Sequence, residues 1–508
     1  YVLDEEGNPR ATFFDKRIRK TVFSDTGEAV DEQLIPISQG ELPNTKFMKE
    51  TRERFERLEA NLGEIPTEDR MKLIIKDAFD EQRKENDERY ASKLEVSGVK
   101  NIVFELRPGH KFYSSKYYKN NLKIKFYDGW IPERNVKPNY DTLLYEFFRF
   151  DNKIFTVEPI TEKYEIEPSS KPYEFNSNLI EEKYIDKQLE KTALISYLRF
   201  EEGKITVDKI SPKDRFGKFI KEDTRLRGMS VGKTMTSYVA GHAICEGYIG
   251  SINSRLNDWP LIENTLYYDQ ELINLLNMQA GDEKYVWSSE FLIPSRFIGV
   301  DDHINDMKTL AAEFKNSKKG KSEFNYSAFS TQLILNYVLF KTGDDFEKIL
   351  EKTFKEKAKI KHSVFFYKIP NSSKDRGNAN IMFFASRYDY LRIAKAMLDD
   401  WQNDTCVGKY LKTIFENRIS KDNDKKSNRG NRTQWSFARG YAGQFQTHYK
   451  GIDKKRAVMG MHGYGGQHVV IDFERSRIVV TNALHENFNY KKIVYDPIKK
   501  GKWKNSFL

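Results

Sequence analysis

A short polar segment before an apolar stretch is the strongest candidate for chemistry in this sequence. Residues 227–234 read RGMSVGKT, and Ser230 and Lys233 stand three positions apart at the start of a predicted helix. That spacing places the two side chains on one helix face, one turn apart. A lysine that burial leaves neutral can take the proton of a serine hydroxyl, and a helix N-terminus directs N–H groups at developing negative charge. The pair therefore predicts a serine nucleophile with a lysine base.

The same segment can be compared with a phosphate-binding loop, G-x-x-x-x-G-K-[ST]. Gly232, Lys233 and Thr234 fit that pattern, but Arg227 stands where the first glycine is required. The residues before Arg227 are too polar for a buried strand, so the backbone cradle for phosphates is not formed. We therefore favour the serine–lysine interpretation. By itself Ser-x-x-Lys recurs by chance, because a capping serine and a surface lysine give the same pattern.

Two later segments have the composition to complete such a site. Tyr326 precedes a predicted helix, and a tyrosine beside a lysine can carry the second proton to a leaving group. Residues 461–467 read MHGYGGQ and precede an apolar strand. Glycines beside a strand let a substrate carbonyl approach the backbone, where an N–H group completes an oxyanion hole. An ordinary glycine-rich turn is the alternative for this segment.

In this order the segments resemble those of the penicillin-recognising serine hydrolases. This is the superfamily of class C β-lactamases, carboxylesterases and 6-aminohexanoate-dimer hydrolases. The resemblance spans about residues 190–485, and several segments without catalytic residues support it. These are EGYI at 246–249, LLNMQAG at 275–281, ASRYD at 385–389, and GGQ at 465–467 with the hairpin that follows.

The resemblance implies a role for each candidate residue. Ser230 would be the acylated nucleophile, Lys233 its base, and Tyr326 the acid–base partner. The backbone N–H groups of Ser230 and Tyr464 would form the oxyanion hole. Gly463 would match the glycine of the family's Lys-Thr-Gly element.

Two departures from the family pattern bear on the substrate. Ala328 stands where the family often has an asparagine, two residues after the tyrosine. Met461 and His462 replace the lysine and threonine that help hold a substrate carboxylate in antibiotic-binding members. This argues against β-lactamase activity and favours a neutral or differently charged ester or amide. His462 could hydrogen-bond the substrate, with Gly465 in the same binding segment, although a structural strand histidine fits equally well.

Patterns for metals and cofactors are weak. Asp301, Asp302 and His303 are adjacent, and three neighbouring loop residues seldom face one ion. His462 and His468 are expected to lie too far apart, on a turn and a strand, to form a zinc pair. We therefore predict neither a cofactor nor a metal.

The elements that must position these residues change in character along the chain. Residues 1–98 predict an acidic helical extension, with helices at about 46–62 and 67–94, and residues 99–178 predict a β-rich segment. Residues 179–508 begin with a hairpin, continue mostly as helices and return to strands. This order predicts an α+β fold of β-lactamase/transpeptidase type, with an antiparallel sheet flanked by helices. Helices are expected at about 230–246, 268–279, 328–342, 346–357 and 386–401, and the hairpins within 193–210 and 456–484.

Composition narrows the function classes. The 508 residues carry a net charge of +10, with −5 in the first hundred residues and +15 in the rest. The lysines are scattered among acids, so we expect a solvated surface and no nucleic-acid binding. No long apolar run predicts a membrane span. Cys245 and Cys406 are the two cysteines, which excludes a disulfide framework, and we expect two core thiols rather than one bridge.

These observations predict a serine hydrolase that cleaves an ester or amide of a small molecule through an acyl-enzyme on Ser230. The alternative is a catalytically inactive fold of the same kind that serves as a binding or assembly module. Homo-oligomerisation through the N-terminal region, residues 1–95, is a further hypothesis. The compartment stays open, with export favoured over the cytoplasm because the chain starts at Tyr1 without an initiator methionine.

Overall fold

The computed structural model describes residues 162–282, 306–421 and 437–500 apart from 214, 313, 370 and 371, together with residues 2–3 and 9–10. The chain divides into two compact units, 1–161 with 294–304 and 162–293 with 305–508. In the first unit, β1 (Val2–Leu3) pairs antiparallel with β2 (Pro9–Arg10). The helices expected at 46–62 and 67–94 and the β-rich residues 99–161 lie outside the described residues. The second unit begins before the expected boundary at residue 179.

The second unit is built on a nine-stranded sheet. Its order is β10-β11-β12-β13-β14-β15-β5-β6-β4, and all neighbours are antiparallel except β4 and β6. β5 pairs with β15, so segments almost 300 residues apart lie side by side. The hairpins predicted within 193–210 and 456–484 are confirmed. The strands are β4 (Asn176–Ser177), β5 (Leu194–Glu201), β6 (Lys204–Ile210), β10 (Ile419–Ser420), β11 (Ala438–Ala442), β12 (Phe445–Tyr449), β13 (Val458–Gly463), β14 (Gln467–Asp472) and β15 (Arg477–Ala483).

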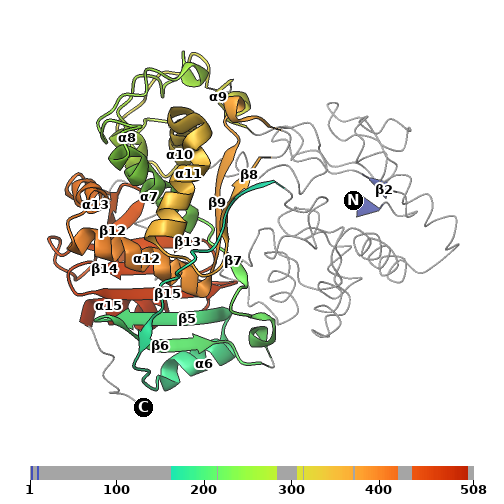
Figure 1. The fold of residues 1–508 in the computed structure, drawn as a ribbon, viewed down its shortest axis with the longest axis vertical. Coiled ribbons are helices and arrows are strands. Elements are labelled where there is room, and N and C mark those ends of the chain that lie inside the picture. Colours follow the sequence, from blue (N-terminus) through green and yellow to red (C-terminus); the bar gives the residue numbers. More distant parts are fainter. Residues whose placement is uncertain are drawn as a thin grey trace, which may run out of the picture. The chain divides into compact units, whose positions relative to one another are not determined.

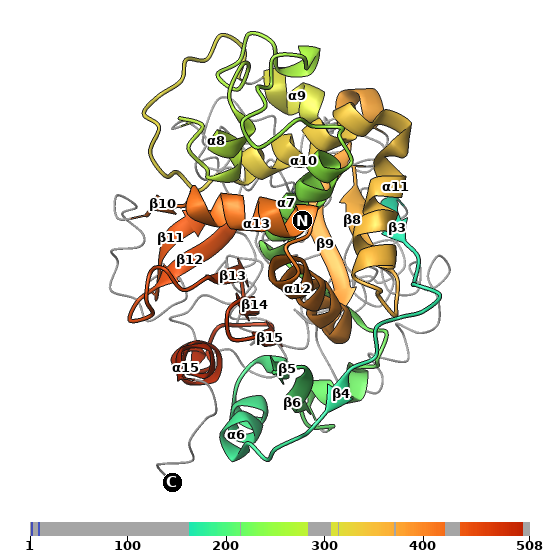
Figure 2. The same cartoon turned by 60° about the vertical axis from the view of Figure 1, so that its left-hand side comes forward.

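Helices cover both faces of this sheet, as Figures 1 and 2 show. On one face, α6 (Lys183–Lys191) and α15 (Asp496–Lys500) close an apolar core over β5, β14 and β15. On the other face lie α7 (Val231–Cys245), α12 (Arg387–Gln402) and α13 (Cys406–Glu416). The predicted α+β architecture, an antiparallel sheet flanked by helices, is confirmed.

A second, four-stranded sheet was not anticipated. It has the order β3-β8-β9-β7, and its last strand leads into α7. Its strands are β3 (Lys163–Ile166), β8 (Val364–Lys368), β9 (Ala379–Ser386) and β7 (Arg225–Arg227). The membership of β3 is the reason why the second unit begins near residue 162.

The remaining helices gather at the top of Figure 1. The helices expected at 328–342, 346–357 and 386–401 are confirmed, whereas the one expected at 268–279 is shorter. The observed elements are α8 (Leu272–Leu276), α9 (Met307–Ala312), α10 (Ala328–Thr342) and α11 (Phe346–Leu350), which continues as a π-helix (Glu351–Lys357). Shorter turns are Phe216–Phe219, Pro260–Ile262, Gly343–Asp345, Lys374–Arg376 and the π-turn Lys491–Tyr495.

Helix α7 runs through the middle of the unit and is buried from Val231 to Ala243. A helix that is enclosed on all sides must be apolar or satisfied all round, which fits its sequence. Gly232 permits a close approach of α7 to β9, since a Cβ at Gly232 would lie 1.9 Å from the carbonyl oxygen of Ile381. The residues at the start of α7 are therefore held on a rigid support.

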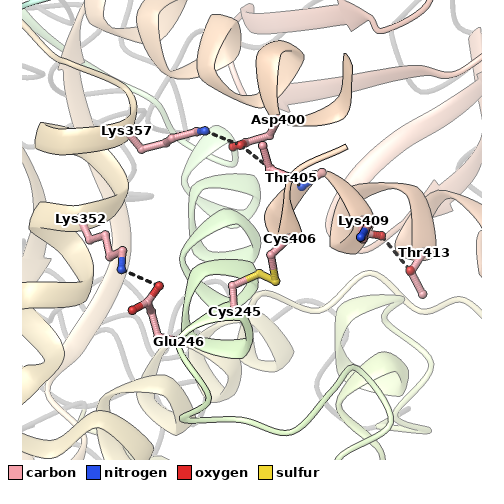
Figure 3. Close-up of a disulfide and its surroundings, with 10 residues drawn as sticks. Cys245, Glu246, Lys352, Lys357, Asp400, Thr405, Cys406, Lys409 and Thr413 are labelled. Atoms are coloured by element: carbon pink, nitrogen blue, oxygen red, sulfur yellow. Dashed lines mark hydrogen bonds and ion pairs between the residues drawn. A yellow bond between two sulfur atoms is a disulfide. The ribbon is translucent and has the colours of Figure 1, made fainter. Parts of the chain in front are cut away.

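The two cysteines form a disulfide between α7 and α13. Cys245 ends α7 and Cys406 begins α13, with Cα atoms 5.8 Å apart (Figure 3). Beside the bridge, Asp400 is fully buried and accepts hydrogen bonds from Lys357 and from the hydroxyl of Thr405. The expectation of two free thiols was wrong, because a sequence separation of 161 residues gives no sign that the two helix ends meet.

Removing this bridge should destabilise the protein. A cross-link that closes a loop of this length restricts the unfolded chain by about 5 kcal/mol in the chain-entropy description. We therefore expect Cys245→Ser with Cys406→Ser, or a phosphine reductant, to lower the melting temperature by roughly 5–10 °C. Thermal unfolding followed by circular dichroism measures this. The reductant should leave the double variant unaffected, and two free thiols in the untreated wild type would contradict the bridge.

Candidate active site

A tight turn places Ser230 at the N-terminus of α7. β7 ends at Arg227, and the N–H of Gly228 donates to the carbonyl of Phe383 on β9 at 2.9 Å. Met229 follows with φ of +52°, in the left-handed region that few residues other than glycine adopt. Ser230 is the N-cap residue, yet its side chain makes no capping hydrogen bond. The alternative of a serine that serves only as a helix cap therefore does not hold.

Lys233 lies one turn further along α7 and is buried. Its side chain is 5% exposed, so it is not the surface lysine of the alternative interpretation. Burial disfavours the ammonium form and lowers the pKa of Lys233 to about 7. The neutral amine is therefore accessible near neutral pH, within one helical turn of a serine hydroxyl.

Tyr326 completes the group from the loop before α10. Its phenol is hydrogen-bonded to the side chain of Ser230, and the Nζ atom of Lys233 lies 5.3 Å from the centre of its ring. Burial raises the pKa of Tyr326 to about 12, so the phenol keeps its proton at neutral pH. The structure thus brings Tyr326 to the Ser230–Lys233 pair, although it lies nearly a hundred positions further along the chain.

The loop that carries Tyr326 is anchored on both sides. The N–H of Asn325 donates to the carbonyl of Met278 at 2.8 Å, and the hydroxyl of Ser327 caps α10 by accepting from the N–H of Ser330. Asp282 is completely buried behind this cap, where Tyr267 donates to it at 2.8 Å and Ser330 at 3.4 Å. Burial raises the pKa of Asp282.

The glycine-rich segment lies against the turn before the nucleophile. A Cβ at Gly463, the last residue of β13, would lie 2.2 Å from the carbonyl oxygen of Gly228. Only glycine permits this approach, which carries the backbone of Tyr464 past the start of α7. Gly465 has φ of +84° in the turn to β14, and Tyr464 has a half-exposed side chain.

His462 is buried on β13. Side chains alternate along a strand, so His462 faces away from the side on which Gly463 meets Gly228. Its ring shares hydrogen bonds with Tyr449 and with His468, each at 2.7 Å, and is buried in the core. Burial, with the nearby His468 and Lys421, holds the pKa of His462 well below its usual value. Of the two interpretations of His462, this placement fits the structural strand histidine and not the residue that hydrogen-bonds the substrate.

The expectation that His462 and His468 lie far apart was wrong. His462 and His468 are direct cross-strand partners on β13 and β14, because the glycine turn folds one strand back onto the other. Their Nδ1 atoms face each other, so the pair is joined by a hydrogen bond rather than by a shared ion. Within residues 162–282, 306–421 and 437–500, no group of three metal-ligating side chains occurs. Asp301, Asp302 and His303 lie outside those ranges.

Sequence reasoning missed several residues around the site. Tyr441 packs its ring edge-on to Tyr326, with centroids 6.4 Å apart, and belongs to an apolar cluster with Phe324 and Met278. Gln444 is 3% exposed and touches three elements at once. The nearest sequence signal for Gln444 is the segment GYAGQ at residues 440–444. Its glycines alone predict a turn and do not indicate what the glutamine contacts.

Comparison with known proteins finds solved structures that share this fold. No protein-family model matches the chain, and no curated protein matches it. The structure is similar to that of a Bacillus anthracis protein assigned as a 6-aminohexanoate-dimer hydrolase, with a TM-score of 0.52 and 15% identity over 72% of this chain and 97% of that one. At this identity the likeness shows a common fold.

Weaker matches include two further proteins. A class C β-lactamase from Rhodobacter sphaeroides matches with a TM-score of 0.42 and 13% identity, over 60% of this chain and 94% of that one. An octameric penicillin-binding protein homologue from Pyrococcus abyssi matches with a TM-score of 0.44 and 15% identity, over 60% and 72%. No helix in the described ranges is both long enough and apolar enough to cross a membrane.

Proposed function

We propose, from the β-lactamase-like serine hydrolase fold of this chain, that it cleaves an ester or amide bond of a small molecule through an acyl-enzyme on Ser230. The observation that carries the proposal is the grouping of three side chains with suited protonation states. Lys233 is buried with a pKa of about 7, and Tyr326 is protonated and hydrogen-bonded to Ser230. A base poised near neutral pH next to a hydroxyl is the arrangement that nucleophilic catalysis requires.

Acylation would proceed in two proton transfers. Neutral Lys233 accepts the proton of Ser230, and the serine oxygen attacks the substrate carbonyl carbon. The backbone N–H groups of Ser230 and Tyr464 stabilise the oxyanion that forms. Tyr326 then donates its proton to the leaving alcohol or amine and regains one from the Lys233 ammonium, which leaves the acyl group on Ser230.

Deacylation would use the same groups in reverse. A water molecule loses its proton to Lys233, directly or through Tyr326, and attacks the acyl carbon. The oxyanion again lies at the N-terminus of α7, where the helix dipole favours negative charge. The proton returns to Ser230 as the carboxylic acid leaves, so the enzyme regains its starting state.

The side chains of β13, the strand beside the nucleophile, indicate which charge the substrate carries next to the scissile bond. Met461 is completely buried on β13, and His462 points into the core on the other side of the sheet. Neither side chain offers a positive charge to a carboxylate next to the scissile bond. We therefore propose a substrate that is uncharged at this position, and no β-lactamase activity.

Labelling with a fluorophosphonate tests the proposal. The probe phosphonylates an activated serine, so intact mass should increase by one adduct, and peptide mapping should place it on Ser230. Ser230→Ala should show no adduct while keeping its circular dichroism spectrum. Ser237, which is buried on the same helix and bonded to Tyr410, is the matched control, and Ser237→Ala should still label. A folded wild type without an adduct from neutral to alkaline pH would instead support the inactive binding module.

A further inference from the structure

The turn between β11 and β12 enters the space between the helices that carry the candidate site. Gly443 and Gln444 both have positive φ, +52° and +74°. A Cβ at Gly443 would lie 2.7 Å from the side chain of Ile414 on α13, so the turn is tightly enclosed. A glutamine in the left-handed region is unfavourable by itself, and such strain persists where the surroundings hold the residue firmly.

Gln444 makes hydrogen bonds to three separate elements. Its backbone carbonyl accepts from the hydroxyl of Thr234 on α7 at 2.7 Å. Its side-chain oxygen accepts from the hydroxyl of Thr331 on α10, also at 2.7 Å. Its side-chain amide donates to the carbonyls of Leu275 and Leu276 at the end of α8, at 3.0 and 2.9 Å. All these groups are buried, so water does not compete for the bonds.

Each of these elements leads directly to a candidate catalytic group. Thr234 is the residue after Lys233 on α7. Thr331 lies in the first turns of α10, five residues after Tyr326. The end of α8 continues to Met278, whose carbonyl accepts the N–H of Asn325, the residue before Tyr326. Gln444 is thus a common hydrogen-bonding partner of the helix with the base and of both anchors of the tyrosine loop.

We propose that Gln444 is a positioning residue, which sets the separation between Lys233 on α7 and Tyr326 before α10. This rests on the proposed function, because the separation matters only if the two side chains exchange protons with Ser230. A displacement of about 1 Å between reacting groups can cost about 100-fold in rate. The two threonine hydroxyls provide a way to loosen this link without changing a group that touches the substrate.

The experiment compares two threonines that bond Gln444 with two that do not. Thr234→Val and Thr331→Val each remove one bond to Gln444. Thr236→Val and Thr342→Val are the matched controls, on the same two helices. Their hydroxyls are equally buried but bond within the helix, to the carbonyls of Gly232 at 3.0 Å and Val338 at 2.8 Å.

We expect Thr234→Val and Thr331→Val to lower kcat for an acyl p-nitroanilide, an amide whose amine must be protonated as it leaves, by about 10- to 100-fold, with KM within about twofold of the wild type. Thr234→Ser and Thr331→Ser, which keep the hydroxyl, should restore most of the rate. The control variants should stay within about twofold in both constants, at matched melting temperatures. Looser packing should also admit water to Lys233, so the acid limb of the rate should move to higher pH in the first pair only.

Gln444→Met provides a second test of the positioning role in case the threonine variants do not fold. Gln444→Met removes the side-chain bonds but keeps the backbone carbonyl that accepts from Thr234. Combined with Thr331→Val, it should cost little more than Gln444→Met alone, since Gln444→Met already removes the bond to Thr331. Phosphonylation of wild-type Ser230 separates the two proposals. If the wild type is labelled but all four valine variants react alike, the positioning role is wrong; if the wild type is not labelled, the proposed function fails first.

Discussion

Replacing Lys233 with methionine should lower kcat/KM for ester hydrolysis by about 10⁴-fold, because the serine then has no neutral amine to take its proton. Methionine has a similar length and suits the buried site, so the variant should remain folded. The matched measurement is the rate of fluorophosphonate labelling of Ser230, which should fall in parallel. Lys233→Arg should be equally inactive, since a guanidinium group stays charged and cannot act as the base.

The wild type should show the titration of Lys233 in its pH profile. The base form is the neutral amine, and its fraction increases with pH through the pKa of about 7. The rate should therefore rise with pH, reach half of its plateau near pH 7, and be about 100-fold lower at pH 5 than at pH 8. Tyr326 titrates only near pH 12, so its ionisation should not limit the rate at neutral pH.

An exposed lysine provides the control. Lys348 has a side chain that is 78% exposed, and Lys348→Met should change neither the rate nor the pH profile. If Lys233→Met kept more than a tenth of the activity, another group would have to be the base. An acid limb that persisted in that variant would lead to the same conclusion.

Tyr326→Phe is expected to have the second largest effect, a loss of about 10²- to 10⁴-fold in kcat. The ring and its packing against Tyr441 remain, and only the phenolic oxygen that bonds Ser230 is lost. The loss should be smaller for an activated ester such as p-nitrophenyl acetate than for an amide. A nitrophenolate leaves without a proton, whereas an amine must be protonated as it leaves.

Tyr337→Phe is the matched control for this prediction. Tyr337 lies on α10, is almost completely buried, and donates to Asp258 at 3.0 Å. Its removal should affect stability but not the ratio of amide to ester rates. Equal losses for both substrates in Tyr326→Phe would indicate that the phenol serves the attack by Ser230 and not the departure of the leaving group.

The protonation states of Lys233 and Tyr326 suit the two roles proposed for them. Lys233 and Tyr326 are both buried next to Ser230, but burial acts on them with opposite consequences. It disfavours the ammonium form of the lysine and so produces a base, and it disfavours the phenolate and so preserves an acid. One apolar environment therefore separates the pKa values of the two groups to about 7 and about 12.

The local features of the site could be predicted from the sequence. Ser230 and Lys233 share a helix face because the α-helix repeats every 3.6 residues, whatever surrounds it. The hairpin of β5 and β6 and the strands β13 to β15 follow from alternation and from glycine turns, which also depend on neighbouring residues alone. Tyr326 is predicted from its order among the segments that resemble those of the penicillin-recognising serine hydrolases. In the structure its phenol is hydrogen-bonded to Ser230.

Only the tertiary structure decided which side chains are enclosed and what they touch. The burial that shifts the pKa of Lys233, the bridge from Cys245 to Cys406 and the inward direction of His462 all depend on distant segments. So do the contacts of Gln444, which reach Thr234 at a separation of 210 residues and Thr331 at 113. Chain geometry repeats over a few residues and can be read locally, whereas such contacts depend on how whole helices and sheets pack together.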